Sequence, residues 1–312
     1  MALLDTGGSL LQELYLRTKG DPITAIQSSL RAFSPPLQSY EIRRVGVTGS
    51  GRQMAGVMLG ADIIKNEITA HAVAAQWARP DVRTVVEIGG QDSKLILLRE
   101  GVAVDFAMNT VCAAGTGSFL DQQASRLGIP IEEFGAMSLL SQTPVRIAGR
   151  CSVFAESDMI HKQQVGHGLP DILAGLCQAL VRNYLSNVAK GKEILPPVIF
   201  QGGVAANPGI RKALAEALNL EIIVPDHFGV MGAIGAAHLA MEDEISGKPT
   251  AFRGAGLAEE EIRTAGRECR GCANICEIVS LCREGKTLAS WGDRCGRWSG
   301  RGDPVDLASQ SC

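Results

Sequence analysis

The chain has 312 residues, of which 46% are hydrophobic, and it carries a formal net charge of −3 with a sequence pI near 6.0. This length predicts two domains with well-formed cores, and the absence of a long basic block argues against nucleic-acid binding. No apolar run is long enough to span a bilayer and no signal-peptide pattern is present, so we expect no membrane association and a cytoplasmic location. Nine cysteines, in a chain large enough to fold without disulfides, favour metal or redox roles in a reducing compartment.

The N-terminal region alternates strand and helix signals. Residues 2–16 predict a β-hairpin with an Asp-Thr-Gly-Gly turn. Asp21 and Pro22 then provide the N-cap and the first residue of a helix of about three turns. A strand over 44–47 follows and runs into a glycine turn over 48–52.

Strands that end in glycine turns recur further along the chain. Residues 84–88 predict such a strand, and in open α/β sheets ligands bind where strands end in this way. The later signals are, in order, a hairpin over 94–106, a helix over about 171–189, a strand over 197–201, a strand over 221–225 and a small-residue segment over 229–237 that permits tight helix packing or a flat ligand surface.

The glycine turn after residues 84–88 predicts a phosphate site. The N–H groups of Gly89 and Gly90 can face phosphate oxygens, while Gln91 and Asp92 add an amide and a carboxylate suited to a nucleotide with bound magnesium. The alternative for each glycine turn is simple strand termination. The chain has neither a G-x-x-x-x-G-K-[ST] loop nor a dinucleotide fingerprint.

A second glycine turn strengthens this prediction. Gly202, Gly203 and Val204 precede a helix that Asn207 and Pro208 begin, and the turn over 48–52 is a weaker third example. Three such turns at strand ends within one α/β pattern indicate a nucleotide site more strongly than any one of them alone.

Two cysteines lie beside runs of small residues. Cys112 and Cys151 each have neighbours whose backbone N–H groups can approach an anionic metal–sulfur centre. A 4Fe-4S cluster needs four thiolates and these segments supply two, so the cluster would lie between two copies of the chain. Cys177, in contrast, falls on the apolar face of a predicted helix and is interpreted as a core residue.

Residues 269–295 hold five more cysteines. Their spacing matches neither the bacterial ferredoxin pattern nor the paired CxxC pattern of zinc sites, so zinc, a second iron-sulfur cluster and an unliganded thiol cluster all stay open. We expect partial disorder over 297–312. The five candidate ligands are Cys269, Cys272, Cys276, Cys282 and Cys295.

Five motifs together resemble one known family. They lie at 88–94, 108–120, 151–157, 202–207 and 229–237. The chain resembles the activator component of 2-hydroxyacyl-CoA dehydratases and the ATP-binding subunits of benzoyl-CoA reductase. This resemblance implies an α/β, actin-like ATPase fold, in which two similar RNase H-like halves enclose ATP, as in acetate kinase, sugar kinases and Hsp70.

The expected organisation follows from the resemblance and the composition shifts. The first α/β half covers 1–80 and the second covers 81–242, with the cluster and nucleotide motifs. A charged, turn-rich linker follows over 243–266, and a Cys-rich appendage occupies 267–312.

The resemblance also implies a function, an ATP-dependent electron-transfer activator of an acyl-CoA dehydratase or reductase in anaerobic metabolism. The implied partners are a second copy of the chain, the dehydratase or reductase component, and reduced ferredoxin or flavodoxin as electron donor. The implied sites are Cys112 and Cys151 for a shared 4Fe-4S cluster, Gln91 and Asp92 for water and Mg²⁺, Gly89, Gly90, Gly202, Gly203 and Val204 near the ATP phosphates, and Asn207 and Gly232 for the nucleoside.

One departure from the family pattern bears on activity. Family members begin with a strand and an Asp-x-Gly-Ser-Thr phosphate loop, which this sequence lacks, and Asp5 to Ser9 is interpreted as a hairpin turn. A misassigned start, a fragment or impaired ATP turnover would each explain the difference. The alternative functions are a kinase-like phosphotransferase and a non-hydrolysing metal-binding assembly module.

Overall fold

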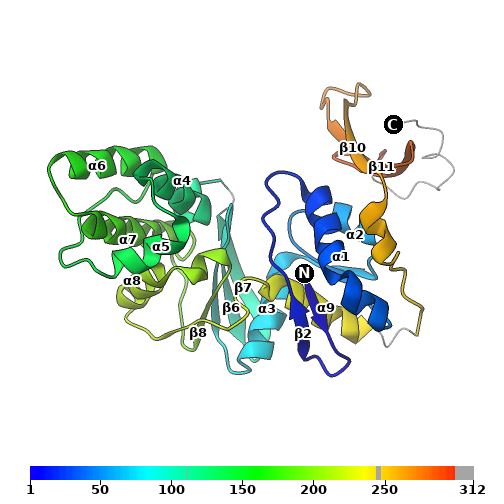
Figure 1. Cartoon of the computed structure of the whole chain (residues 1–312), viewed down its shortest axis with the longest axis horizontal. Coiled ribbons are helices and arrows are strands. Elements are labelled where there is room, and N and C mark those ends of the chain that lie inside the picture. Colours follow the sequence, from blue (N-terminus) through cyan, green and yellow to red (C-terminus); the bar gives the residue numbers. More distant parts are fainter. Residues whose placement is uncertain (110, 244–246, 299–312) are drawn as a thin grey trace. The chain divides into compact units, whose positions relative to one another are not determined.

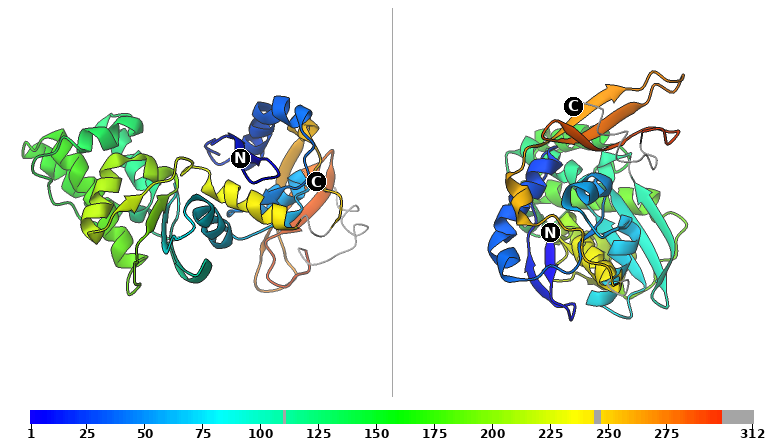
Figure 2. Two further views of the ribbon diagram at one scale, coloured as in Figure 1. Left: turned by 90° about the horizontal axis from the view of Figure 1, so that it is seen from below. Right: turned by 90° about the vertical axis from the view of Figure 1, so that its right-hand side faces the viewer.

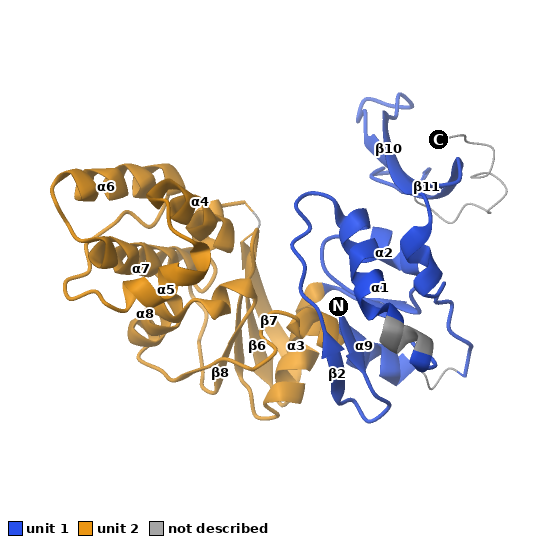
Figure 3. Cartoon of the chain, viewed as in Figure 1, with its two compact units in different colours: residues 1–66, 236–312 blue, residues 67–235 orange. Residues whose placement is uncertain are grey.

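The computed structural model describes residues 1–109, 111–243 and 247–298, and the chain divides into two compact units (Figures 1 and 3). Unit 1 comprises Met1–Asn66 with Ala236–Cys312, and unit 2 comprises Glu67–Gly235. These boundaries differ from the expected ones at 80/81 and 242/243. Helix α3 (Glu67–Ala78) belongs to unit 2, and α9 (Met231–Asp243) crosses the second boundary.

Unit 2 is built on a five-stranded mixed sheet in the order β7-β6-β5-β8-β9. The hairpin predicted over 94–106 is confirmed, because β6 and β7 pair antiparallel, as do β5 and β6. The pairs β5–β8 and β8–β9 are parallel. The strands are β5 (Thr84–Ile88), β6 (Ser93–Arg99), β7 (Val102–Asn109), β8 (Val198–Gln201) and β9 (Ile222–Ile223).

Helices cover both faces of this sheet. Five of them lie together on one face, as Figures 1 and 2 show, and α3 covers part of the other. Side chains alternate along β6, so Leu95 and Leu97 join the larger core while Ile96 and Leu98 pack on the α3 side. The five helices are α4 (Gly117–Leu127), α5 (Ile131–Ser138), α6 (Ser152–Gln164), α7 (Leu169–Asn187), which matches the predicted helix, and α8 (Pro208–Leu218).

Unit 1 begins with the predicted hairpin, β1 (Ala2–Leu4) and β2 (Leu10–Glu13). The Asp5 carboxylate accepts N–H bonds from Gly7 and Ser9 at 2.9 and 2.8 Å, which makes this segment a side-chain-stabilised turn. The capping prediction is confirmed as well, since Asp21 accepts the N–H of Thr24 at 3.0 Å.

The rest of the N-terminal part of unit 1 consists of a long helix, a shorter helix and two short strands. Helix α1 (Pro22–Ser39) has 18 residues and is longer than the predicted three turns. The apolar pattern that predicted it ends at Phe33, whereas the helical backbone continues to Ser39. Strands β3 (Gly46–Val47) and β4 (Ile63–Ile64) pair in parallel around α2 (Arg52–Leu59). Among the described residues, β1–β2 and β3–β4 are separate two-stranded sheets.

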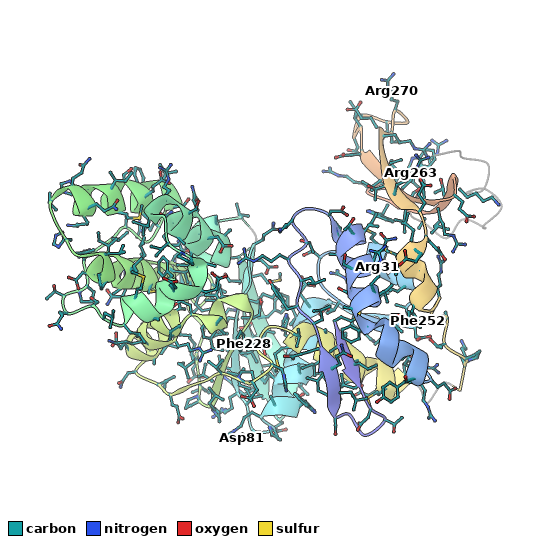
Figure 4. All side chains as sticks on the ribbon, viewed as in Figure 1. Arg31, Asp81, Phe228, Phe252, Arg263 and Arg270 are labelled. Carbon is teal, nitrogen blue, oxygen red and sulfur yellow. The ribbon has the colours of Figure 1, made fainter. Side chains whose placement is uncertain are left out.

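The C-terminal part of unit 1 is a three-stranded antiparallel sheet. Its strands are β10 (Ile262–Glu268), β11 (Glu277–Arg283) and β12 (Lys286–Trp291), so the segment expected as a linker over 243–266 contains the start of β10. That segment also holds the 3-10 helix η4 (Ala255–Glu259), which Arg31 of α1 contacts through Ala258 O at 2.6 Å and Glu259 at 2.8 Å (Figure 4).

The sequence also led to expectations about disorder at the C-terminal end and about membrane-spanning helices. The partial disorder expected over 297–312 falls on residues that, apart from 297 and 298, lie outside the described part of the chain. Within the described ranges, no helix has both the length and the apolar character that a membrane crossing requires.

The small-residue segment over 229–237 permits close helix packing, as expected. A Cβ atom at Gly235 would overlap the backbone carbonyl of Ala70 in α3, whereas one at Gly229 would meet no atom within 4 Å. Contact between these backbones therefore depends on glycine at position 235.

We predict that Gly235→Ala destabilises the protein by about 1–3 kcal/mol, because the added methyl group forces α3 and α9 apart. Gly229→Ala is the matched control from the same segment and should change stability by less than about 0.5 kcal/mol. Urea denaturation of both variants checks this, and equal stabilities would contradict the packing argument.

Candidate functional site

Two glycine turns lie side by side at one edge of the unit 2 sheet. The parallel register pairs Glu87 with Gln201, so the residues that follow β5 and β8 emerge together. Gly202 has a φ of +90°, and a Cβ there would lie 2.5 Å from the Ile88 carbonyl oxygen. Only glycine allows this approach, and the structure thereby brings the Gly89–Gly90 and Gly202–Gly203 turns together.

A buried ionic cluster, formed by Lys94, Glu87 and Asp92, packs against these two turns. Lys94 on β6 is 3% exposed, and its Nζ lies 2.9 Å from Glu87 Oε2 and 2.8 Å from Asp92 Oδ1. A Cβ at Gly202 would lie 2.8 Å from Glu87 Oε1, and one at Gly89 would lie 3.3 Å from Asp92 Oδ1. The lysine therefore fixes both carboxylates directly beneath the two glycine turns.

Burial perturbs the titration of groups in this region. Desolvation raises the pKa of Glu87 to about 7, although the Lys94 ammonium acts in the opposite direction. His71 of α3 bonds through Nδ1 to Gln201 Nε2 at 2.8 Å, and burial followed by the charge of Lys94 lowers its pKa to about 4. At neutral pH the histidine is therefore uncharged, and a Glu87 pKa of about 7 means that this carboxyl is only partly ionised.

The other residues predicted to bind the nucleotide lie in several different elements. Gln91 is exposed on the first turn, and Gly232 lies in the first turn of α9. Val204 is buried in the 3-10 helix η2 (Gly203–Ala206). The Asn207 side chain accepts the N–H of Ile210 at 3.1 Å, so its amide oxygen serves as the N-cap of α8.

The first glycine turn is bonded directly to the helix that follows Cys112. Gly117 N–H donates to Gly89 O and Ser118 N–H donates to Gly90 O, both at 2.8 Å. These are the first two residues of α4, whose N–H groups have no partner within the helix. The Gly89–Gly90 turn and the segment from Cys112 to the start of α4, here called the Cys112 loop, are thus parts of one hydrogen-bonded unit.

The structure brings Cys112 and Cys151 into the same region. Cys112 Sγ lies 3.9 Å from the Arg150 carbonyl oxygen, next to Cys151, and both thiols are partly exposed. Cys112 is the N-cap of the 3-10 helix η1 (Ala113–Gly115), and Cys151 is the N-cap of α6. Helix N-termini favour anions, so this pair of partly exposed thiols suits metal-bound thiolates.

Contacts between α4 and α6 stabilise this arrangement. Glu156 of α6 lies 2.5 Å from the Arg126 guanidinium and accepts a 3.4 Å bond from Gln122, both on α4. The surface around the thiols is apolar, with Val111, Val153 and Phe154 exposed by 96%, 65% and 66%. An exposed apolar rim of this kind is typical of an interaction surface.

Four of the five cysteines predicted as C-terminal ligands lie at one end of the β10–β11–β12 sheet. Cys269 N–H donates to Cys276 O at 2.7 Å, with Cys272 in the same loop. Cys295 belongs to the segment after β12, whose Trp298 donates its indole N–H to Cys269 Sγ at 3.2 Å. This bond lowers the pKa of the Cys269 thiol.

Cys282 differs from the other four candidates. It is buried within β11, opposite Arg263 of β10, and its sulfur is in a disulfide bond. Within the described ranges, no group of three or more Cys, His, Asp or Glu side chains is already assembled for a metal ion. The four thiols of the sheet end would therefore have to move toward one another to share a metal.

Sequence reasoning missed the charged pair beneath the glycine turns. Glu87 is the one charged residue of β5, and Lys94 is the second residue of β6, where four apolar residues follow it. A charge inside a buried strand needs a partner, so this pattern was the available signal.

The fold and the paired glycine turns define an α/β protein of the actin-like ATPase class. The structure matches the ADPNP-bound activator of 2-hydroxyisocaproyl-CoA dehydratase from Clostridium difficile with a TM-score of 0.72 and 33% identity, over 79% of this chain and 91% of that one. It also matches component A of (R)-2-hydroxyglutaryl-CoA dehydratase from Acidaminococcus fermentans with a TM-score of 0.61 and 37% identity, over 64% and 75% of the two chains.

Sequence comparison leads to the same group. The 2-hydroxyisocaproyl-CoA dehydratase activator of Clostridioides difficile is 39% identical over 208 residues, which are 66% of this chain and 77% of the relative. The model of the BadF/BadG/BcrA/BcrD ATPase family matches residues 21–240, and the chain belongs to this family. The resemblance noted from the five motifs is thus confirmed.

We predict that Lys94→Met destabilises unit 2 by about 3–5 kcal/mol, because it leaves the buried Glu87 carboxylate without its counter-charge. Adding Glu87→Gln should recover part of that loss, since the uncompensated charge is then absent. Lys212→Met, which removes an exposed ion pair with Glu216, is the control and should cost less than about 0.5 kcal/mol. Chemical denaturation measures all three, and a Lys94→Met variant as stable as the control would refute the role of the cluster.

Proposed function

We propose that this protein is an ATP-dependent electron-transfer activator of an acyl-CoA dehydratase or a related reductase. One observation supports this most directly. The carbonyls of Gly89 and Gly90 bond to the start of α4, and the loop immediately before α4 carries Cys112. A nucleotide bound at the glycine turns would therefore act on the loop of a thiol ligand.

In this proposal the glycine turns and the acidic pair hold the nucleotide. Backbone N–H groups of Gly89, Gly90, Gly202 and Gly203 would contact phosphate oxygens. Asp92, fixed by Lys94 and only partly exposed, would bind Mg²⁺ directly or through water. Gln91, on the exposed side of the turn, would orient the attacking water.

The thiols of Cys112 and Cys151 would provide half the ligands of a 4Fe-4S cluster shared by a homodimer. The proximity of the two cysteine loops, their partly exposed sulfurs and the helix N-termini behind them fit such a group. When bound, the cluster supplies one-electron transfer, with a reduction potential that depends on hydrogen bonds to sulfur and on exposure. Exposed Val111, Val153 and Phe154 would be covered by the second copy.

The proposed partners follow from the electron path. Reduced ferredoxin or flavodoxin would supply an electron, and an acyl-CoA dehydratase or reductase would receive it, as in anaerobic metabolism. A centre whose sulfurs are partly exposed would be accessible to both in turn.

We also propose that the C-terminal sheet holds a separate metal, zinc or a second iron-sulfur cluster. The support is positional, since Cys269, Cys272, Cys276 and Cys295 lie at one end of the sheet while Cys282 lies further along β11. Thiolates of this number suit either metal.

For the nucleotide site, we predict that Asp92→Asn weakens magnesium-dependent binding of ADPNP about 10- to 100-fold, because a neutral amide holds the metal or its water less well. Asp81→Asn is a control at an exposed aspartate paired with Arg79, and it should bind as the wild type does. Calorimetric titration with and without Mg²⁺ measures this, and unaltered binding by Asp92→Asn would exclude its metal role.

For the sulfur centre, we predict about two iron atoms per chain in anaerobically purified protein and loss of the reduced-cluster EPR signal in Cys112→Ala and Cys151→Ala. Cys177→Ala, at a buried core thiol, is the control and should keep both iron and signal. A Cys269→Ala variant separates any metal of the C-terminal sheet from this centre. A colourless wild-type monomer that phosphorylates a small molecule would instead indicate the kinase-like function.

A further inference from the structure

Two buried asparagines hold the backbone of the two cysteine loops. Asn183 of α7 is 1% exposed, and its Nδ2 donates to Gly149 O at 2.6 Å and to Arg150 O at 3.4 Å. Asn109, at the end of β7, accepts the Cys112 N–H at 3.0 Å and donates to Cys112 O at 2.8 Å. Each loop is thus fixed through its main chain and not through its thiol.

The two asparagines meet at Gly115, between the loops. A Cβ at Gly115 would lie 2.7 Å from Asn183 Oδ1 and 3.2 Å from Asn109 Nδ2. Asn183 Oδ1 is held in turn by Asn187 Nδ2 at 3.1 Å, one helical turn along α7. Asn183 therefore touches the loops of both cysteines from one rigid helix.

The direction of the bonds from Asn183 determines how the Cys151 loop presents its dipoles. In a planar trans peptide, the C=O and N–H groups point in roughly opposite directions. Because the carbonyls of Gly149 and Arg150 point at α7, the N–H groups of Arg150 and Cys151 point away from it. Among the described residues neither N–H group has an acceptor, so both are available to an anionic group on the outer side of the loop.

The same bonds reduce a repulsion that would otherwise act on Cys112. Its Sγ lies 3.9 Å from Arg150 O, where a protonated thiol can donate but a thiolate would face a negative carbonyl oxygen. The second Asn183 donor offsets the partial charge on that oxygen. Donors of this kind, one step behind the ligands, commonly tune metal affinity and reduction potential.

From this geometry we infer that Asn183 is a positioning residue of the sulfur centre: it fixes the spacing of the Cys112 and Cys151 loops and turns the Cys151-loop N–H groups outward. The inference rests on the proposed function for its metal, but the bracing of the loops belongs to the protein alone. Asn183 contacts neither thiol, and it acts through the backbone carbonyls.

The test compares Asn183→Leu, which keeps the side-chain volume and removes both donors, with Ser138→Ala, which removes the buried hydrogen bond from Ser138 Oγ to Gly135 O within α5. Hydrogen exchange over 147–152 in anaerobically purified protein should accelerate at least about tenfold in Asn183→Leu alone. Iron retention against a chelator should fall about 10- to 100-fold, and the EPR spectrum and midpoint potential should shift.

Each remaining outcome decides the question. Wild-type exchange and a wild-type EPR spectrum in folded Asn183→Leu would overturn the inference. If Asn183→Leu does not fold, Gly115→Ala takes its place, because its methyl group displaces Asn183 and Asn109 without removing them. If the wild type binds no iron, the proposed function fails, and the exchange measurement alone then supports or overturns the bracing role.

Discussion

Two backbone hydrogen bonds, from Gly117 and Ser118 to the carbonyls of Gly89 and Gly90, are the constraint on which the site depends. They satisfy N–H groups that the first turn of a helix leaves unpaired, and their acceptors are the carbonyls of the glycine turn after β5. Moving either the turn or the helix alone would break both bonds. The glycine turn and the Cys112 loop therefore move together or stay together.

The buried ion cluster explains why this constraint is rigid. Lys94 joins the two carboxylates beneath the turns, and Tyr184 of the long helix α7 donates its hydroxyl to the Lys94 carbonyl at 2.9 Å. The same helix carries Asn183, one residue earlier. Helix α7 thus contacts both the Lys94 cluster and the two cysteine loops. The cluster itself resists change because a buried charge without a partner would cost several kcal/mol.

The C-terminal sheet holds its cysteines differently from unit 2. Its strands form a small antiparallel layer, and its cysteines lie in the connections at one end. The loops of such a sheet can adjust to a metal without disturbing the strand register. The glycine turns of unit 2, by contrast, are packed so closely that a Cβ atom at Gly202 would overlap the Ile88 carbonyl oxygen.

The sequence by itself determined the local elements that side chains or glycine enforce. These include the Asp5 turn, the Asp21 and Asn207 caps, the β6–β7 hairpin and the glycine turns after two strands, because each depends on neighbours within a few residues. The sequence also showed that Cys112 and Cys151 share a setting. Only the tertiary structure decided what these elements meet, since the pairing of Lys94 with Glu87 and the reach of Asn183 to Gly149 depend on strand register and helix placement. A one-residue change of strand register would turn Lys94 to the opposite face of the sheet, which periodicity in a single segment does not exclude.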